Sequence, residues 1–176
     1  CIRDRFPVIL SGAGVVIGGA IEETKKLAEK LEAPVCSGYQ HNDSFPGSHP
    51  LAVGPLGYNG SKAAMELISK ADVVLALGTR LNPFSTLPGY GIDYWPKNAN
   101  IIQVDINPDR IGLTKKVTIG ISGDAKLVAR QIFDKLASNA GDANRQERKD
   151  LIHQTKSAWL QKLSSLDHEE DDEGTV

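Results

Sequence analysis

Two largely apolar runs, each followed by polar residues, stand out in the hydrophobic pattern of the chain. The first covers residues 71–77 and is followed by residues 78–80, and the second covers residues 101–104 and is followed by Asp105. A strand that is buried on both faces of a parallel sheet has such a continuous apolar run. Ligands of these sheets bind beyond the carboxyl ends of the strands. The pattern therefore predicts an α/β fold with a ligand site where these two strands end.

The rest of residues 7–136 alternates between strand patterns and amphipathic helix patterns. We predict strands over residues 7–10, 34–36, 71–77, 101–106 and 115–121, the last at a sheet edge with Val117, Ile119 and Ile121 pointing inward. We predict helices over residues 20–31, 61–70 and 125–136, with Ser61 and Asp124 as caps. Residues 37–60 and 82–96 contain too many turn-forming residues for regular structure. This order predicts a doubly wound parallel sheet of about five or six strands, with helices on both faces.

The chain divides into four parts by composition. We expect residues 1–6 to be a linker from a preceding domain, residues 7–141 to form the α/β domain, residues 142–166 to form a helical connector, and residues 167–176 to be an acidic disordered tail. The connector carries a narrow apolar stripe around Trp159 that needs a surface to pack on. Because the chain begins at Cys1, we interpret it as a piece of a longer polypeptide.

Length, charge and cysteine content narrow the classes of protein that fit. A chain of 176 residues is long enough for one domain with an appendage. Its formal net charge of -2 offers no basic excess to attract nucleic acid. No apolar stretch approaches the roughly 20 residues of a membrane-spanning helix. Two cysteines are too few for a disulfide framework. We therefore expect a cytoplasmic protein that binds neither nucleic acid nor membranes.

A glycine-rich turn follows the first predicted strand. Gly12, Gly14 and Gly18 precede a helix, so their backbone amides and the helix dipole are placed to receive a phosphate. The spacing differs from the G-x-G-x-x-G pattern of dinucleotide-binding folds, and residues 36–38 provide no carboxylate to hold a ribose. A tight turn that only allows close packing fits the same glycines. The sequence leaves both interpretations open.

Four side chains at predicted strand and helix ends are further candidates for ligand binding. Thr79 and Arg80 offer a hydroxyl and a guanidinium to an anion. Asp105 ends a buried strand, and a carboxylate there needs a partner such as a ribose or an adenine amine. Asp124 is expected mainly to cap a helix, and a capping residue can also touch a ligand. The candidate cofactor-binding residues are therefore Gly12, Gly14, Thr79, Arg80, Asp105 and Asp124.

A cluster of polar residues in the first long loop raises the question of a metal site. It contains His41, Asn42, Asp43 and His49. Prolines and a glycine between these residues do not hold them on one helical face, and no further firm ligand is evident. We expect hydrogen bonds to the loop backbone and no metal ligand. The sequence also lacks a G-x-S-x-G elbow and a phosphate-binding P-loop, and we identify no catalytic residue in it.

Five motifs in this order resemble the central domain of thiamine-diphosphate-dependent enzymes. They are residues 7–14, residues 49–51 with Gly54 and Gly57, residues 71–80, residues 104–108, and residues 123–124. The resemblance implies a nucleotide-binding-like α/β domain. Some relatives bind FAD or ADP in this domain at positions that match the six candidate residues, and others have lost that ligand. The resemblance therefore implies a nucleotide site that is either retained or vestigial.

The two long loops carry a finer resemblance within this family. Residues 38–50 and 82–96 are most similar to those of the sulfoacetaldehyde acetyltransferases. This implies a parent enzyme that converts sulfoacetaldehyde and phosphate into acetyl phosphate and sulfite, with thiamine diphosphate and magnesium as cofactors. In the family, an N-terminal and a C-terminal domain hold these cofactors, so this chain alone is expected to be inactive. Those domains are its expected partners, and the parent is expected to be a homo-oligomer.

Two other classes of protein fit parts of the sequence. NAD-dependent deacylases of the sirtuin type have motifs similar to residues 12–14 and 78–80, but the cysteines of their zinc module are missing here. A purely structural spacer, whose aromatic loops serve as contact surfaces, needs no ligand. The first alternative predicts binding of NAD, and the second predicts no nucleotide binding.

Overall fold

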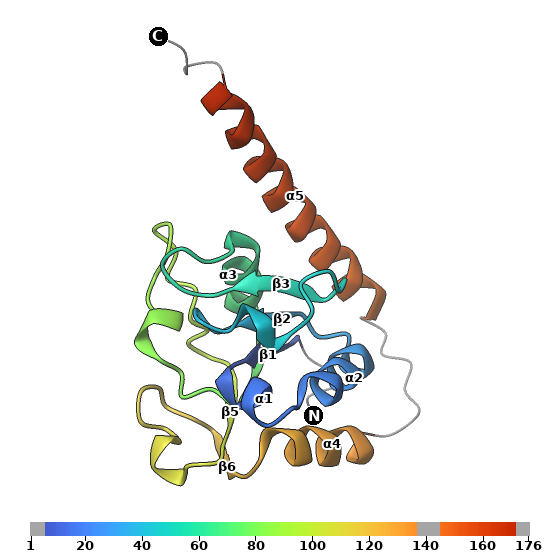
Figure 1. Cartoon of the computed structure of the whole chain (residues 1–176), viewed down its shortest axis with the longest axis vertical. Helices are drawn as coiled ribbons and strands as arrows, with labels where there is room; N and C mark the ends of the chain where they lie inside the picture. Colours follow the sequence, from blue (N-terminus) through green and yellow to red (C-terminus); the bar gives the residue numbers. More distant parts are fainter. Residues whose placement is uncertain (1–5, 137–144, 172–176) are drawn as a thin grey trace.

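A computed structural model of the chain describes residues 6–136 and 145–171. Its centre is one six-stranded sheet with the strand order β3-β2-β1-β4-β5-β6, and every neighbouring pair is parallel (Figure 1). The strands are β1 (Pro7–Ser11), β2 (Val35–Ser37), β3 (Ala52–Pro55), β4 (Val73–Leu77), β5 (Asn100–Asp105) and β6 (Ile119–Ser122). This arrangement confirms the predicted parallel α/β sheet.

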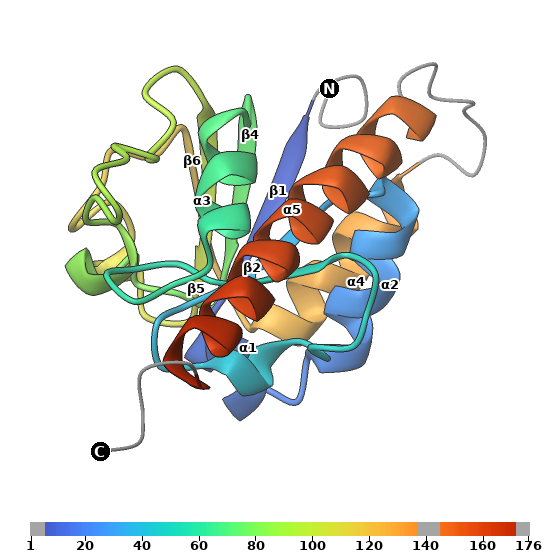
Figure 2. The same cartoon turned by 90° about the horizontal axis from the view of Figure 1, so that it is seen from above.

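Helices cover both faces of the sheet. They are α1 (Ala13–Ile17), α2 (Ile21–Leu31), α3 (Lys62–Ser69), α4 (Ala125–Lys135) and α5 (Arg145–Asp171), with short 3-10 helices η2 (Asn42–Ser44), η3 (Pro83–Ser85) and η4 (Pro108–Arg110). α2 packs against α4 on one face, and α3 lies on the other (Figure 2). The chain steps outward from β1 to β2 through α2, and back across the sheet from β3 to β4 through α3. Because right-handed crossovers in opposite directions place their helices on opposite faces, the topology explains both layers.

The central strands β1 and β4 form the middle of the core. Every residue of both strands is buried, as the continuous apolar runs predict. The neighbouring strand β5 contains two buried polar residues, Gln103 and Asp105, and Gln103 lies in its middle. Its Nε2 donates to the carbonyl oxygens of Thr79 at 3.1 Å and Arg110 at 3.2 Å. Gln103 therefore fixes the turns after β4 and β5, where the candidate site residues lie.

The structure contains a β-strand and an α-helix that the sequence pattern does not predict. β3 lies inside residues 37–60, a region expected to be irregular, and α1 starts directly after Gly12, where we expect only a turn. β3 has four residues and lies at the sheet edge. Its Gly54 has a φ of +93°, so a turn-forming residue stands inside the paired segment. A strand this short gives almost no periodic signal, which explains the error.

The opposite edge strand is shorter and less buried than predicted. We predict a strand over residues 115–121, whereas β6 begins at Ile119 and ends at Ser122. Val117 and Ile121 pack against the core as expected, but Ile119 is exposed and the inward orientation predicted for it is wrong. An edge strand has a neighbour on one side only, so solvent reaches more of its surface.

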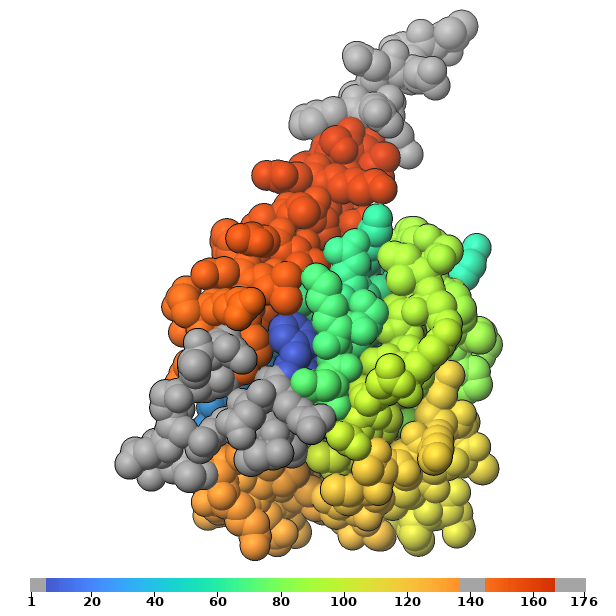
Figure 3. All heavy atoms as spheres, turned by 180° about the vertical axis from the view of Figure 1, so that it is seen from behind, coloured from blue at the N-terminus to red at the C-terminus, as the bar shows by residue number. Residues whose placement is uncertain are grey.

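α5 lies beside α3 and projects beyond the body of the domain (Figure 3). Its first turn docks on the end of α2, where the carboxylate of Glu32 accepts from Nε of Arg145 at 2.8 Å and lies 3.5 Å from Nζ of Lys149. Nζ of Lys156 donates to two backbone carbonyls of the loop before β3, at 2.9 and 3.3 Å. Ile152 is buried in the contact. The predicted connector is thus held on the domain by both polar and apolar contacts.

α5 also continues past the predicted end of the connector. We predict a disordered acidic tail from residue 167, and the structure extends the helix through Asp171. Glutamate is a good helix former, and an existing helix propagates at low cost, so the first acidic residues prolong it. Leu160, Leu163 and Leu166 in this outer part are exposed. The apolar stripe of the connector is therefore packed on the domain only in part.

The start of α3 allows a direct test of helix capping. Oγ of Ser61 accepts from the backbone N of Ala64 at 3.3 Å, which confirms the predicted cap. We expect Ser61→Ala to lower the free energy of unfolding by about 1 kcal/mol, because an N–H group of the first turn loses its acceptor. Urea denaturation measures this change. Ser69→Ala, at the exposed other end of α3, is the control, and equal stability of the two variants would contradict the assignment.

Candidate functional site

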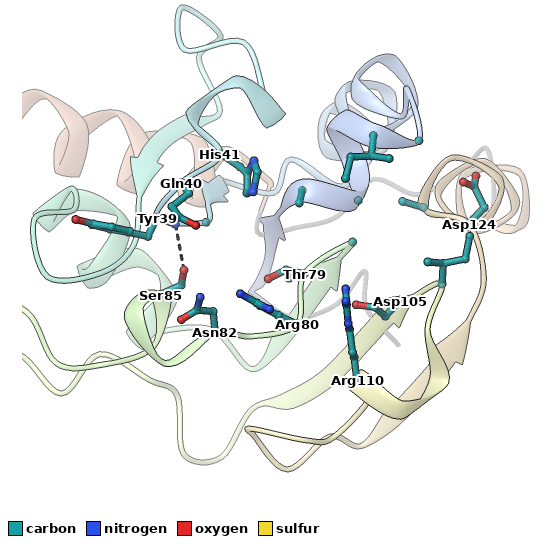
Figure 4. Close-up of a pocket in the computed structure, with 18 of the residues that line it drawn as sticks. Tyr39, Gln40, His41, Thr79, Arg80, Asn82, Ser85, Asp105, Arg110 and Asp124 are labelled. Carbon is teal, nitrogen blue, oxygen red and sulfur yellow. Dashed lines mark hydrogen bonds between the residues drawn. The ribbon is translucent and has the colours of Figure 1, made fainter.

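A cleft of about 460 Å³ opens at the carboxyl ends of β1, β4 and β5 (Figure 4). Its walls come from the turns after these strands, from α1 and from the start of α4. The described residues that line it include Gly14, Thr79, Arg80, Asp105 and Asp124, five of the six predicted site residues. These residues meet because parallel strands all end at the same edge of the sheet. The structure therefore brings most of the predicted site together around one cavity.

Gly12, the sixth predicted site residue, is not among the described residues that line the cleft. A Cβ atom at Gly12 would lie 2.6 Å from Cβ of Thr79. The backbone N of Gly12 donates to the carbonyl oxygen of Leu77 at 3.1 Å. Gly12 therefore lets the turn after β1 pack closely on the end of β4. At this position, the structure favours the close-packing interpretation of the glycine motif.

Gly14 and Gly78 bring two turns into direct backbone contact. The backbone N of Gly14 donates to the carbonyl oxygen of Gly78 at 2.8 Å. A Cβ atom on Gly14 would lie 2.7 Å from Cα of Gly78. Gly78 also has a φ of +60°, which other residues rarely adopt. As a result, the turns after β1 and β4 meet through backbone atoms at the edge of the cleft.

Two arginines line the cleft, Arg80 after β4 and Arg110 after β5 (Figure 4). Both residues are exposed. Within residues 6–136 and 145–171, neither guanidinium has an ion pair or a hydrogen-bond partner. A planar guanidinium binds the oxygens of a phosphate or a carboxylate in a two-point contact. The pair therefore makes the cleft suitable for an anion.

The hydroxyl and carboxylate candidates are partly occupied by the local backbone. Oδ1 of Asp105 accepts from the backbone N two residues later at 2.9 Å, and Oγ1 of Thr79 does the same at 3.2 Å. Oδ1 of Asp124 accepts from the backbone N three residues later at 3.0 Å, which confirms the predicted cap of α4. Each carboxylate keeps a second oxygen, and Thr79 keeps its hydroxyl proton. Capping and ligand contact are thus compatible for these side chains.

The other side of the cleft comes from the two long loops. The backbone N of Tyr39 donates to Oγ of Ser85 at 3.0 Å, which joins the loops (Figure 4). Gln40, His41 and Asn82 complete this side. Polar side chains therefore surround the cleft on the loop side as well as on the strand side.

Arg110 is a functional candidate that the sequence pattern does not predict. It lies in η4, five residues after Asp105. Its position at the cleft depends on Gln103, whose side chain holds the carbonyl oxygen of Arg110. Its sequence position, a basic residue shortly after the end of a predicted strand, could have indicated an anion-binding residue. Ser85 and Asn82 gave no comparable signal, because the course of an irregular loop has no periodicity.

The polar cluster of the first long loop does not converge on one point. Nδ1 of His49 accepts from the backbone N of Leu51 at 3.1 Å, and Nε2 of His49 lies 3.1 Å from Oε1 of Glu29. His41 lies 3.8 Å from Asp43 and lines the cleft instead. Among the described residues, no three His, Cys, Asp or Glu side chains are grouped to hold a metal ion.

Within residues 6–136 and 145–171, no helix has the length and apolar character to cross a bilayer.

Tyr94 anchors the loop of residues 82–96 that forms one wall of the cleft. Its ring is buried, and its hydroxyl donates to the carbonyl oxygen of Ser85 at 3.1 Å. Burial raises the pKa of Tyr94 from 10.0 to about 12. The unfolded chain therefore releases this proton at lower pH than the folded protein. The contribution of Tyr94 to stability is complete below pH 10 and is lost as the pH rises to about 12.

The pH dependence of stability tests this environment of Tyr94. Between pH 10 and pH 12, we expect the free energy of unfolding of the unsubstituted protein to fall by up to about 2.7 kcal/mol, since one pKa unit corresponds to about 1.36 kcal/mol. The Tyr94→Phe variant should not show this loss. At neutral pH, Tyr94→Phe should cost about 1 kcal/mol, because the carbonyl oxygen of Ser85 loses its donor. Urea unfolding across this pH range measures both effects. Parallel stability profiles for the two proteins would show that the Tyr94 hydroxyl is solvated.

Comparison with known families defines the class of protein to which this fold and cleft belong. A family model described as "Thiamine pyrophosphate enzyme, central domain" matches residues 3–132. The chain belongs to this family. This result confirms the resemblance that the order of the five motifs indicates.

Individual relatives narrow the similarity further. The chain is 81% identical over 171 residues to a "Probable sulfoacetaldehyde acetyltransferase" from Rhizobium meliloti, which is 97% of this chain and 29% of the relative. It is 74% identical over 172 residues to a sulfoacetaldehyde acetyltransferase from Roseovarius nubinhibens, which is 98% of this chain and 28% of the relative. A "Probable acetolactate synthase large subunit" from Methanocaldococcus jannaschii is 39% identical over 160 residues, which is 91% of this chain and 24% of the relative.

A solved structure agrees with the fold. The X-ray structure of a protein described as a "putative thiamin diphosphate-dependent enzyme" from Mycobacterium smegmatis superposes with a TM-score of 0.64 at 26% identity. The match covers 80% of this chain and 27% of that chain. The chain thus spans less than a third of the length of these relatives. The alternative of a sirtuin-type deacylase finds no support in any of these comparisons.

Proposed function

We propose that this domain is part of a sulfoacetaldehyde acetyltransferase that acts in sulfonate metabolism. In this reaction the C–S bond of sulfoacetaldehyde breaks, sulfite leaves, and the acetyl group is transferred to phosphate. The observation that carries the proposal is the identity of 81% and 74% to proteins with this name, compared with 39% to an acetolactate synthase-type relative. A shared central-domain fold is enough to explain an identity of 39%. The higher identities of 81% and 74% support the same enzymatic activity in this protein and in those relatives.

Thiamine diphosphate and magnesium are the cofactors that we propose for the full-length enzyme. The family to which the chain belongs supports the thiamine cofactor. The described residues do not fit a magnesium diphosphate group by themselves, because no three potential metal ligands are grouped among them. Asp105 and Asp124 also already accept from backbone N–H groups. We therefore assign these cofactors to the other domains and propose no catalytic residue in this chain.

For the domain itself, we propose a scaffolding role with an anion site of the nucleotide type. The observation that favours a ligand is the pair of cleft arginines, Arg80 and Arg110, which have no partner among the described residues. ADP, alone or as part of FAD, offers phosphates to these guanidiniums and ribose hydroxyls to Asp105. Thr79, Asp124 and the backbone of Gly14 adjoin the same space. Gly12 supports the site by allowing the close packing described above.

The substrate assignment is tested on the purified full-length enzyme. One reaction contains sulfoacetaldehyde and phosphate, and a second contains pyruvate, each with thiamine diphosphate and magnesium. We expect equal amounts of sulfite and acetyl phosphate from the first reaction and no acetolactate from the second. Acetolactate formation without release of sulfite would assign the protein to the other branch of the family.

Several features of the full-length protein stay predictions. These are the limits of the domain at residues 7–141, a connector at residues 142–166 that leads to another domain, a homo-oligomeric assembly, and a location in the cytoplasm. The identity to the acetyltransferases supports an enzyme with further domains, because the chain covers only 29% and 28% of two of them. Size-exclusion chromatography with light scattering measures the assembly.

A further inference from the structure

An exposed apolar surface lies beside the cleft. It consists of Tyr39, Tyr58, Phe84, Leu87 and Tyr90, which are 40%, 73%, 62%, 50% and 56% exposed, and we call it the aromatic platform. Its residues come from the loops that follow β2, β3 and β4. The platform therefore occupies the same carboxyl edge of the sheet as the cleft. Adjoining large apolar side chains on a protein surface mark a contact site.

Short contacts join the three loops that carry the aromatic platform. The rings of Tyr39 and Phe84 stack with their centroids 6.4 Å apart. Gly57, the neighbour of Tyr58 in the sequence, packs closely against Phe84 and Tyr39. A Cβ atom on Gly57 would lie 2.4 Å from the carbonyl oxygen of Phe84 and 3.1 Å from Cδ2 of Tyr39. The hydroxyl of Tyr90 donates at 3.2 Å to a carbonyl oxygen of the same loop as Tyr58. Tyr39 also lines the cleft, but its ring points away from it, so the platform adjoins the cleft (Figure 4).

The loop that carries Phe84, Leu87 and Tyr90 is held in place from beneath. The buried Tyr94 donates to this loop at Ser85, and Ser85 in turn accepts from the backbone of the neighbouring loop. Tyr90 has a φ of +52°, a conformation that costs free energy for a residue other than glycine. The fold thus maintains a strained backbone that presents a large side chain to solvent. This is the behaviour of a preformed contact surface.

The course of α5 indicates which part of a longer protein lies next to the aromatic platform. The rings of Trp159 and Tyr90 are in contact, with centroids 5.9 Å apart. From Trp159, α5 continues to Asp171, which is about 18 Å at 1.5 Å per residue. Polypeptide that follows α5 therefore starts about 18 Å beyond the contact between Trp159 and the platform. Polypeptide that precedes β1 arrives at the amino edge of the sheet, because all strands are parallel and the platform lies at the other edge (Figure 2).

We propose that the aromatic platform is the docking surface for the part of the full-length protein that follows α5. The relative that is 81% identical is more than three times as long as this chain, which covers 29% of it, so most of that relative lies outside the matched region. The inference rests on the proposed place of this domain in a longer enzyme and does not depend on the substrate. Docking buries the apolar side chains and holds the following domain at the edge that contains the cleft.

Photo-cross-linking in the full-length enzyme tests this docking. Tyr58 is replaced by p-benzoylphenylalanine, because its ring is the most exposed of the platform. After irradiation, we expect a cross-link within one chain that joins position 58 to a peptide from the region after α5. The matched control is the same replacement at Leu127, which is 60% exposed on α4 and lies on the opposite face from α3. We expect no cross-link to that region from the control.

Three results would overturn the proposal. They are a cross-link from position 58 to a second copy of the chain, a cross-link to polypeptide that precedes β1, and no cross-link at all. Hydroxyl-radical footprinting of the unsubstituted enzyme provides a second measurement that needs no variant. We expect Tyr58 and Phe84 to be oxidised at least several-fold less than Leu113, which is 72% exposed in the domain. The sulfoacetaldehyde assay on the same preparation keeps a failure of docking distinct from a failure of the proposed function.

Discussion

Gly78→Ala is expected to lower the free energy of unfolding by about 2–5 kcal/mol, the largest effect of a single substitution at the cleft. The φ of +60° at this position costs an alanine about 1–2 kcal/mol. In addition, the new Cβ would lie 2.7 Å from Cα of Gly14, a contact between two backbones that cannot be relieved by a rotamer change. Such overpacking costs about 1–3 kcal/mol.

Three other glycines separate the two causes of this effect. Gly19 has a φ of +59° but no atom within 4 Å of an added Cβ, so Gly19→Ala isolates the backbone strain. Gly14 has the close contact without the positive φ, so Gly14→Ala isolates the overpacking. Gly47 has neither, and Gly47→Ala should be neutral or stabilise by up to about 1 kcal/mol. Urea unfolding of the four variants measures the series. A Gly78→Ala protein as stable as the Gly47→Ala protein would show that the two turns are not in contact.

Removal of the cleft arginines is expected to weaken binding of ADP by the full-length protein. Each contact between a guanidinium and a phosphate contributes about 1.5–3 kcal/mol. Arg80 and Arg110 are exposed, so we expect the lower end of this range, about a 10-fold loss for each single variant. The double variant Arg80→Ala/Arg110→Ala should lose about 100-fold. Isothermal titration calorimetry with ADP measures these affinities.

A matched control comes from Arg130, which is exposed on α4 and lines a different cavity. Arg130→Ala should leave the ADP affinity unchanged. Parallel titrations with FAD and NAD identify the preferred nucleotide. If the unsubstituted protein binds none of the three, the cleft is vestigial and the scaffolding role alone remains. If NAD alone binds, the proposed anion site needs a different ligand assignment.

The sequence predicts the middle of this fold better than its edges, for a physical reason. β1 and β4 are buried on both faces, and such strands must be apolar throughout, so their pattern is unmistakable. β3 and β6 lie at the two edges, where short length and contact with solvent remove that requirement. The first edge strand was missed, and the second was predicted too early and with Ile119 on the wrong side.

The candidate site shows the same division between residues fixed by topology and residues fixed by loops. Asp105 and Arg80 follow directly from strands, so the rule that ligands bind at the carboxyl edge predicts their place. Arg110 reaches the cleft only because the buried Gln103 holds its carbonyl oxygen, a tertiary contact that no local pattern reveals. The aromatic platform depends in a similar way on the buried Tyr94 hydroxyl. Loop courses of this kind require the structure.

The proposed role of this chain is best tested by comparing sulfite release by the full-length enzyme with that by residues 1–176 alone. Both proteins are assayed with sulfoacetaldehyde and phosphate, with and without thiamine diphosphate and magnesium. We expect the full-length enzyme to release sulfite only when thiamine diphosphate is present, and residues 1–176 to release none. Sulfite release by residues 1–176, or by the full-length enzyme without thiamine diphosphate, would contradict the placement of this chain as a noncatalytic central domain.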